Sequence, residues 1–353
     1  MRWSKLLSPS KVAQAIRIES GALWTLRHGR PDVILHFLGG LGDELLLTCV
    51  AHELRFRRPD LAVWQISSAA ELLRGNPDYS LILDSRHWAL RHSNLLGRWR
   101  KSLRYSEMPI AAAYEVPPRE HILAILCRSA GIEGPVQLRP WYFQNESEAS
   151  GGRYAPRQMC VQSVGEMTHG SWMQNKVWIH DRMQSVIDEF AARHADYRVL
   201  QIGTQNDRLL DRVMDLRGKT TLRQTATVLS QSYCFLGTSG LLAHLARAVE
   251  CRSVIIYGGR EHAWQSGYSC NENVETHIPC APCWLWNDCD FDRRCMRDIT
   301  AQDILNALER VLARHGQPIE IDEVFLAPSD EPHPKSYPTT PGSRKIANLL
   351  PFC

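Results

Sequence analysis

A strand, a glycine-rich turn and a helix start follow one another in the segment Val33–Asp43, and this pattern constrains the fold more than any other. Val33–Phe37 is largely apolar, as expected of a buried strand, and three glycines follow within Gly39–Gly42. Such glycines let the backbone turn tightly, and they leave the first amides of the next helix open to an oxygen-rich ligand. We predict that this helix runs over Glu44–Arg58 and ends at Pro59. In an α/β protein, ligands bind at such a turn.

The bulk composition is that of an ordinary globular protein. The chain has 353 residues, enough for two domains, with 44% hydrophobic and 22% charged residues. Its net charge of +3 is too small to indicate a nucleic-acid partner. No apolar run reaches the roughly 20 residues of a membrane span, and the N-terminus lacks the apolar core of a signal peptide. We therefore expect a cytoplasmic protein, with a place at the cytoplasmic face of the inner membrane left open. Its eleven cysteines are then thiols or metal ligands.

Two successive β-α-β patterns predict two Rossmann-like halves. Three apolar strands open the chain, at 33–37, 62–66 and 80–84, whereas the segment 87–138 looks mainly helical. After a polar linker near 146–152, four more strands alternate with helices, at 159–162, 197–202, 233–236 and 254–257. The last three end at glycines, which places a ligand crevice at their carboxyl ends. The predicted class is α/β, with two parallel sheets facing a central cleft.

The expected domain boundaries follow from these patterns. The first domain covers 1–150 and the second covers 151–325, with a cysteine cluster at 280–295 inside the second. The segment 326–353 is rich in proline and is expected to be a loosely packed or disordered tail.

Asp43 follows the first glycine turn and has two interpretations. Aspartate is favoured as a helix N-cap, although a full capping box would need Glu or Gln where Leu46 stands. The alternative is a general base aimed into the cleft, with Gly39, Gly40 and Gly42 shaping the loop around it. Position alone favours the cap.

A second glycine turn spans Gly237–Ala246, where a buried strand ends and another helix begins. Hydroxyls and the first helical amides there are suited to hold a pyrophosphate. The residues concerned are Thr238, Ser239, Gly240 and Leu241. His244 follows one turn into the helix, where it either faces the same ligand or is a core histidine.

Two further residues stand near predicted strand and helix ends. Lys176 precedes a predicted helix at 181–195, where it either neutralises a phosphate or is an ordinary surface lysine. Asp207 follows the strand at 197–202, where an acid often binds ribose hydroxyls but also often caps a helix.

Four cysteines with the spacing C-x2-C-x5-C-x5-C follow His277, namely Cys280, Cys283, Cys289 and Cys295. Four thiolates at this density suit a tetrahedral zinc or iron site. The spacing is not the usual pair of C-x2-C knuckles, so free thiols or a disulfide stay as alternatives. Trp284 and Trp286 beside them are expected to pack, although an aromatic ring can also support a sugar.

Together these residues resemble glycosyltransferase family 9, the family of the bacterial ADP-heptose:lipopolysaccharide heptosyltransferases. The similarity runs from Val33 to Leu312. The segments that carry it are, in the family's order, Gly42-Asp43 with the helix start after it, Asn76-Pro77-Asp78, Lys176-Val177-Trp178, Leu216–Leu222, the second glycine turn with His244-Leu245-Ala246, and Cys280-Ala281-Pro282-Cys283 with Cys295-Met296.

The resemblance implies a GT-B fold and an inverting glycosyltransferase. The enzyme would move heptose or another hexose-like sugar from a nucleotide-sugar to a lipopolysaccharide-type glycan, a glycolipid or a protein acceptor. The resemblance implies that Asp43 is the base and that Lys176 and residues 238–241 bind the diphosphate. Asp207 would meet the ribose and His244 the donor sugar. Lys176 and helix amides would stabilise the leaving diphosphate, so catalysis needs no metal, and zinc or iron at the cysteines would be structural.

One departure from the family pattern leaves the donor open. Heptosyltransferases of the lipopolysaccharide core usually carry an aspartate near the place of Thr238 or Ser239, and no acid stands at either position. Two alternatives therefore stay beside the transferase: a non-catalytic binding or assembly member of the same fold, and a GT-B nucleotide-sugar epimerase. The sequence does not fix the oligomeric state.

Overall fold

The computed structural model describes residues 28–37, 39–86, 100–106, 115–149, 151–163 and 173–328. Residues 329–353 of the predicted proline-rich tail lie outside this part, as do 87–99 and 107–114 of the segment expected to be helical.

The N-terminal half is built on a parallel sheet that has four strands among the described residues, in the order β3-β2-β1-β4. The strands are β1 (Val33–Phe37), β2 (Val63–Ser67), β3 (Leu81–Asp84) and β4 (Arg100–Leu103). Their apolar residues pack against helices α2 (Leu41–Arg57) and α5 (Ile122–Ser129), which bury Leu46, Val50 and Leu123 completely.

The C-terminal half contains a second parallel sheet, ordered β11-β10-β9-β6-β7-β8. Its strands are β6 (Arg157–Val161), β7 (Tyr197–Gln201), β8 (Met214–Asp215), β9 (Cys234–Thr238), β10 (Ser253–Gly258) and β11 (Glu272–Glu275). Successive side chains of a strand point to opposite faces, so Leu236 packs under helices α7 (His180–Arg193) and α12 (Ala301–Ala313). Phe235 packs under α8 (Leu222–Ser230) and α9 (Leu241–Ala248) on the other face.

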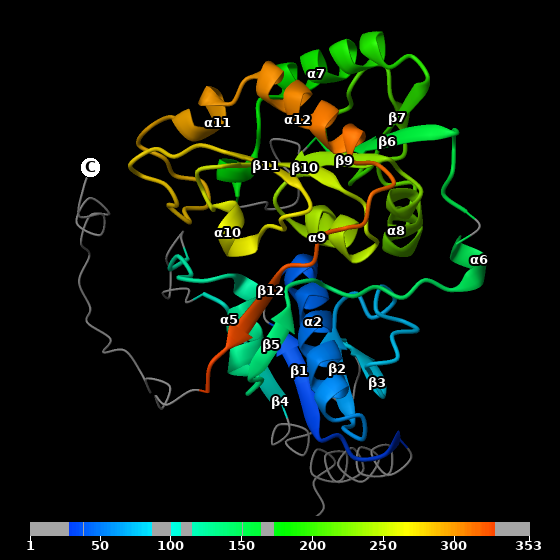
Figure 1. Ribbon diagram of the computed structural model, residues 1–353, viewed down its shortest axis with the longest axis vertical. Coiled ribbons are helices and arrows are strands. Elements are labelled where there is room, and N and C mark those ends of the chain that lie inside the picture. Colours follow the sequence, from blue (N-terminus) through cyan, green and yellow to red (C-terminus); the bar gives the residue numbers. More distant parts are fainter. Residues whose placement is uncertain are drawn as a thin grey trace, which may run out of the picture.

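The two halves are joined by the linker that contains α6 (Glu146–Ala149) and by a second connection. Strand β12 (Glu323–Leu326) leaves the C-terminal half and pairs antiparallel with β5 (Gly134–Gln137) of the N-terminal half, as Figure 1 shows. The sequence did not indicate this return of the chain, and the predicted boundary at 325 stays a prediction. The expectation that 87–138 is mainly helical is wrong for β4 and β5.

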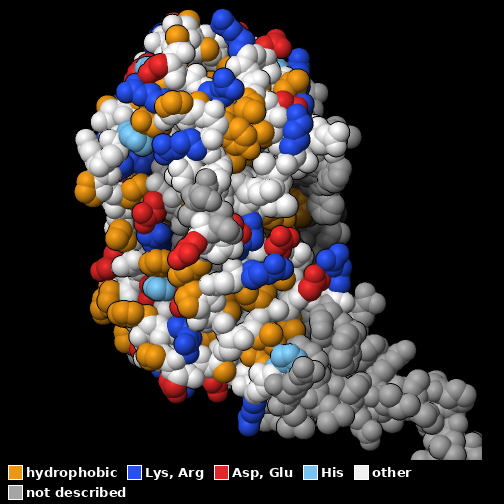
Figure 2. Space-filling model, turned by 90° about the vertical axis from the view of Figure 1, so that its right-hand side faces the viewer, with side chains coloured by type: hydrophobic (Ala, Val, Ile, Leu, Met, Phe, Trp, Pro, Cys, Tyr) orange, Lys and Arg blue, Asp and Glu red, His pale blue; other side chains and the backbone are white. Residues whose placement is uncertain are grey.

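The predicted class is confirmed, because two parallel sheets are each covered by helices in an α/β arrangement. The helices α2 and α9 meet where the halves face each other (Figure 1), and Leu45 of α2 belongs to the same buried cluster as Leu242 and Leu245 of α9. On the face drawn in Figure 2, basic and acidic side chains are interspersed rather than gathered by sign.

No helix in the described part of the chain is both long enough and apolar enough to cross a membrane.

Candidate functional site

The first glycine turn positions the carboxylate of Asp43. Gly40 is the N-cap of α2, so Asp43 occupies the third helical position, and its interpretation as the N-cap itself is wrong. Its Oδ2 accepts a hydrogen bond from the Gly40 amide at 2.8 Å, and its Oδ1 accepts one from the Tyr105 hydroxyl at 2.7 Å. A Cβ on Gly39 would lie 2.4 Å from Oδ2, so a larger residue here would displace the carboxylate. Both carboxylate oxygens are therefore held in place.

Gly42 brings the starts of the two helices together. A Cβ at this position would lie 3.3 Å from Cα of Leu241 and 3.7 Å from Cδ2 of His244. A side chain here would require the start of α9 to shift by a few tenths of an ångström, so glycine favours this close approach of α2. Asp43, the next residue, therefore lies at the junction of the two halves.

The second glycine turn borders a cleft of about 570 Å³. Strand β9 ends at Thr238, and Gly240 precedes α9 with φ of 153°, a conformation that favours glycine. The lining comes from the carboxyl ends of the parallel strands and from the helix starts after them. It includes Gln162, Lys176, Gly203, Thr204, Gln205, Gly218, Thr220, Thr238, Ser239, Gly240 and Leu241. This volume lies within the range of small-molecule sites, roughly 300–1,000 Å³.

Lys176 ends the short 3₁₀ helix η2 (Gln174–Lys176) and reaches the second turn. Its Nζ lies 2.7 Å from Oε1 of Glu261, and the Ser239 hydroxyl donates to the same oxygen. Burial alone would raise the pKa of Glu261, but the charges of Lys176 and Arg260 and the bonds from Lys176 and Ser239 lower it to about 2. An acid therefore does lie beside Ser239, supplied from 22 residues further along the chain.

The charges at the junction come from both halves. Burial, the largest effect, raises the pKa of Asp43, and nearby Glu261 raises it further, against the hydrogen bonds from Tyr105 and Gly40 and the charge of Lys176. Burial also raises the pKa of Tyr105 far above its ordinary value, so this hydroxyl stays a donor. The result is a carboxylate with increased proton affinity, as a general base requires.

A second ion pair at the junction joins Arg260 of the C-terminal half to Glu115 of the N-terminal half. Arg260 is almost fully buried, lies 3.3 Å from Glu115 and stacks 4.9 Å from the centre of the Trp284 ring. Trp284 is itself buried, which confirms that this residue packs. Burial raises the pKa of Glu115, while Arg260 and Lys176 lower it.

His244 is both a buried histidine and a neighbour of the second turn. Its Nδ1 lies 2.7 Å from the Tyr268 hydroxyl, and burial lowers its pKa to about 3. The imidazole is therefore neutral near pH 7 and offers hydrogen bonds without charge.

Asp207, like His244, is a predicted donor-binding residue that is not part of the cleft lining. Its two carboxylate oxygens accept from the amide and hydroxyl of Thr204, at 3.1 and 2.9 Å. It does not line the cleft, whereas Gly203, Thr204 and Gln205 of the same loop do. Its carboxylate shapes this loop.

The cysteine cluster lies in the segment that leads into α11 (Arg294–Asp298). None of the four cysteines forms a disulfide, and the Sγ of Cys289 accepts from the Arg293 amide at 3.3 Å. Burial raises the pKa of Cys283 to about 11 and also raises that of Cys295. In the described part of the chain, no three of these sulfurs lie within 4.8 Å of one another. The donor set suits zinc or iron chemically, and a disulfide is not formed.

Sequence reasoning missed Tyr105, Glu115, Arg260, Glu261 and Tyr268. Each reaches the site through a contact far along the chain, and none lies in the two glycine turns at 39–42 and 237–240. The strand-end position of Arg260 and Glu261, directly after Gly258-Gly259, was the one signal available for them.

Comparison with known proteins finds a family model that matches part of the chain and solved structures with a similar fold. The model of glycosyltransferase family 9 (heptosyltransferase) matches residues 148–288. No curated protein matches the chain. Among solved structures, a glycosyltransferase family 9 protein from Veillonella parvula matches with 13% identity and a TM-score of 0.58, over 80% of this chain and 97% of its own.

Two structures from E. coli match similarly. ADP-heptose lipopolysaccharide heptosyltransferase II has 15% identity and a TM-score of 0.59, over 80% of this chain and 99% of its own. The dodecameric iron-containing heptosyltransferase TibC, solved in complex with ADP-D-β-D-heptose, has 16% identity and a TM-score of 0.61, over 80% and 76%. The expected resemblance is thereby confirmed, and the fold is that of the GT-B glycosyltransferases of family 9.

Proposed function

From its GT-B fold and a C-terminal half that matches glycosyltransferase family 9, we propose that this protein is an inverting glycosyltransferase. It moves heptose or another hexose-like sugar from a nucleotide-sugar to a lipopolysaccharide-type glycan, a glycolipid or a protein acceptor. The observation that carries the proposal is the meeting of α2 and α9, which puts a restrained carboxylate beside a cleft that carries a lysine and a helix start.

The donor diphosphate lies on the second glycine turn. The first amides of α9, the hydroxyls of Thr238 and Ser239 and the ammonium of Lys176 all border this cleft. Helix amides and a cation favour an anion, and they stabilise the negative charge that grows on the departing diphosphate. Lys176 is paired with Glu261, so it is already oriented when the donor arrives. The nucleoside lies along Gly203–Gln205, and the ribose role of Asp207 stays a prediction.

Asp43 takes the proton from the acceptor hydroxyl. The acceptor oxygen then forms a bond to the anomeric carbon while the bond from that carbon to the diphosphate breaks, and its electron pair leaves with the phosphate. The raised pKa of Asp43 suits it to accept this proton, and Tyr105 fixes one of its oxygens. Attack from the N-terminal half, opposite the leaving group on the C-terminal half, inverts the anomeric centre.

Glu261 contacts Ser239 and Lys176 of the cleft, and His244 lies close to Gly42, the residue before Asp43. A carboxylate at Ser239 accepts hydrogen bonds from sugar hydroxyls, and the neutral imidazole of His244 adds a second polar contact. The acid missing from positions 238 and 239 therefore has a replacement, which favours a sugar-transferring enzyme over a non-catalytic member of the fold.

The cysteine cluster is assigned a structural role. The four sulfur donors suit zinc or iron, TibC is an iron-containing relative in fold, and the catalytic steps above use only side chains and amides. A cytoplasmic location, where thiols stay reduced, agrees with this assignment.

The test begins with a thermal-shift panel of ADP- and UDP-linked sugars, because a ligand of the folded state raises its melting temperature. The donor found is then incubated with lipopolysaccharide, and release of nucleoside diphosphate is followed. Asp43→Asn should lose roughly 10²-fold or more of the turnover while keeping donor affinity. Asp32→Asn, whose carboxylate accepts from the Ala62 amide away from the cleft, is the matched control.

The outcomes separate the alternatives. Unchanged turnover in Asp43→Asn, with chemistry rate-limiting, would refute the base. An altered nucleotide-sugar formed without acceptor would indicate an epimerase, and absence of binding to every nucleotide and nucleotide-sugar would indicate a non-catalytic protein.

A further inference from the structure

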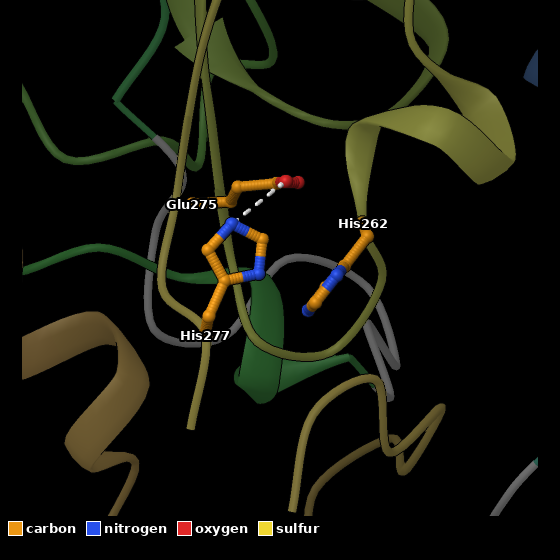
Figure 3. Close-up of side chains that lie close together, drawn as sticks. All are labelled: His262, Glu275 and His277. Carbon is orange, nitrogen blue, oxygen red and sulfur yellow. Dashed lines mark ion pairs between the residues drawn. The ribbon is translucent and has the colours of Figure 1, made fainter. Parts of the chain in front are cut away.

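A cluster of two histidines and one glutamate lies beyond the residues used above. His262 is the N-cap of the short helix α10 (Ala263–Ser266), Glu275 is the last residue of β11, and His277 follows two residues later. Each residue offers one ligand atom, and all three atoms lie within 4.8 Å of one another. Figure 3 shows the three side chains converging from these two segments.

From this geometry we propose that His262, Glu275 and His277 bind a divalent transition-metal ion, with zinc as the reference ion. Imidazole and carboxylate together suit zinc and its neighbours, whereas magnesium and calcium prefer sites made of oxygen alone. Three ligands at about 2.0–2.1 Å from a tetrahedral zinc lie about 3.3 Å apart. The 3.5 Å between Oε1 of Glu275 and Nε2 of His277 is close to that separation.

The buried imidazole of His262 is not accounted for by the protein alone. His262 is only 6% exposed, and its Nε2 has no hydrogen-bond partner among the described residues. A buried polar nitrogen without a partner is costly, at about 1–3 kcal/mol. The contact between Glu275 and His277 explains those two side chains as an ion pair but leaves His262 unexplained. A metal ion accounts for all three.

The surroundings orient the ligands. The other oxygen of Glu275, Oε2, accepts from the Ala263 amide at 2.6 Å, which leaves Oε1 to face the histidines. The ring centres of His262 and His277 are 5.0 Å apart, at 82°. The side chain of His277 is 74% exposed, so solvent completes the coordination. An ion here would tie the segment that carries Glu261, the residue before His262, to the end of β11.

The test uses the full-length protein in reducing buffer, stripped of metal with a chelator and titrated with Co²⁺. Wild type should bind one ion per chain whose spectrum lacks thiolate charge transfer. His277→Ala should lower the affinity for that ion by more than about 100-fold, because even substitutions outside the ligand shell lower metal affinity 10–100-fold. His277 is exposed, so this variant should fold, and circular dichroism verifies it.

Glu275→Gln is the second variant, and Glu272→Gln on the same strand is its matched control. Glu272 pairs with Arg310 and Arg314 and is not part of the cluster. Loss of the ion in Glu275→Gln and its retention in Glu272→Gln would support the site. The same Co²⁺ stoichiometry in wild type and His277→Ala would overturn it, and so would a wild-type spectrum with thiolate-bound cobalt alone. Because the spectrum distinguishes nitrogen and oxygen ligands from sulfur, a metal bound at the four cysteines would not be mistaken for an ion at this cluster.

Discussion

The two glycine turns of this protein look alike in sequence and differ in what occupies the helix start. At the first, the carboxylate of Asp43 bonds back to the Gly40 amide, so the chain itself satisfies this donor. At the second, no side chain caps α9, and the helix start borders the cleft. The acid at the third helical position of α2 thus takes the place of an external anion, and in the proposed mechanism it is the base. Without such an acid, the equivalent turn stays available to a phosphate.

The largest effect on kcat is expected when the cation at the second turn, Lys176, is removed. Lys176→Gln should lower kcat by roughly 10²–10³-fold, the usual cost of losing one group that stabilises developing negative charge. Lys219→Gln, at an exposed lysine paired with Asp215, is the control and should keep wild-type turnover. Steady-state kinetics with the donor found by thermal shift measures both. A Lys176→Gln enzyme with kcat within a few-fold of wild type would contradict the anion site.

Lys176→Gln should also lower the free energy of unfolding, because Lys176 is paired with Glu261. Without Lys176, the buried carboxylate of Glu261 loses its closest cation. Glu261→Gln added to Lys176→Gln should therefore recover part of the lost stability in urea unfolding, since an unpaired buried charge is costly. No recovery in the double variant would mean that the two side chains are not coupled.

The turns themselves could be predicted from the sequence, but their partners could not. Strands such as β1 and β10 are short apolar runs that end at glycines, and they stand within a residue of their predicted places. Strand β4, Arg100–Leu103, is polar and mostly exposed, so periodicity does not distinguish it from a loop. The pairing of β5 with β12 joins segments far apart in sequence, and no local pattern encodes it.

The site residues divide in the same way, into those that the sequence indicates and those that only the fold reveals. Asp43, Lys176, Thr238 and Ser239 stand at strand ends or helix starts, where short motifs point to them. Glu261 is one acid among the 38 Asp and Glu residues of the chain, and only the fold shows that it meets Ser239. Asp207 illustrates the opposite case, because a motif indicated it and its own loop holds its carboxylate away from the cleft.

A matched pair of glycine substitutions should separate the two turns. Gly240→Ala places a side chain at φ of 153°, which should cost about 1–3 kcal/mol of folding free energy and weaken donor binding, although space around it is open. Gly42→Ala instead pushes against the backbone of Leu241, so it should lower kcat more than stability. Urea unfolding and the split between kcat and KM measure this. Equal effects of both variants on stability and kinetics would show that the turns are interchangeable.

The second turn should also carry a pH dependence of stability. His244 has its ordinary pKa of 6.5 when unfolded and about 3 when folded, because burial disfavours its charged form. Between these values only the unfolded chain takes up the proton, so stability should fall as pH drops below 6.5, by up to about 1.4 kcal/mol per pH unit. His244→Gln should flatten this slope in urea unfolding at several pH values. His52→Gln on α2 is the control, and equal slopes in wild type and His244→Gln would refute the assignment.

The smallest effect compares one hydroxyl at each turn. The Tyr105 hydroxyl donates a hydrogen bond to Asp43, and the Tyr268 hydroxyl is within hydrogen-bond distance of Nδ1 of His244. The bond from Tyr105 lowers the pKa of Asp43, so Tyr105→Phe should raise it and move the acidic limb of the kcat/KM profile to higher pH. Turnover should then fall near neutral pH and approach the wild-type value in alkali, where Asp43 is ionised in both enzymes. Tyr268→Phe leaves the contacts of Asp43 intact, so its acidic limb should coincide with that of wild type. A shifted limb in both variants would mean that the limb reports general loosening of the junction, and a shift in Tyr268→Phe alone would move the base from the first turn to the second.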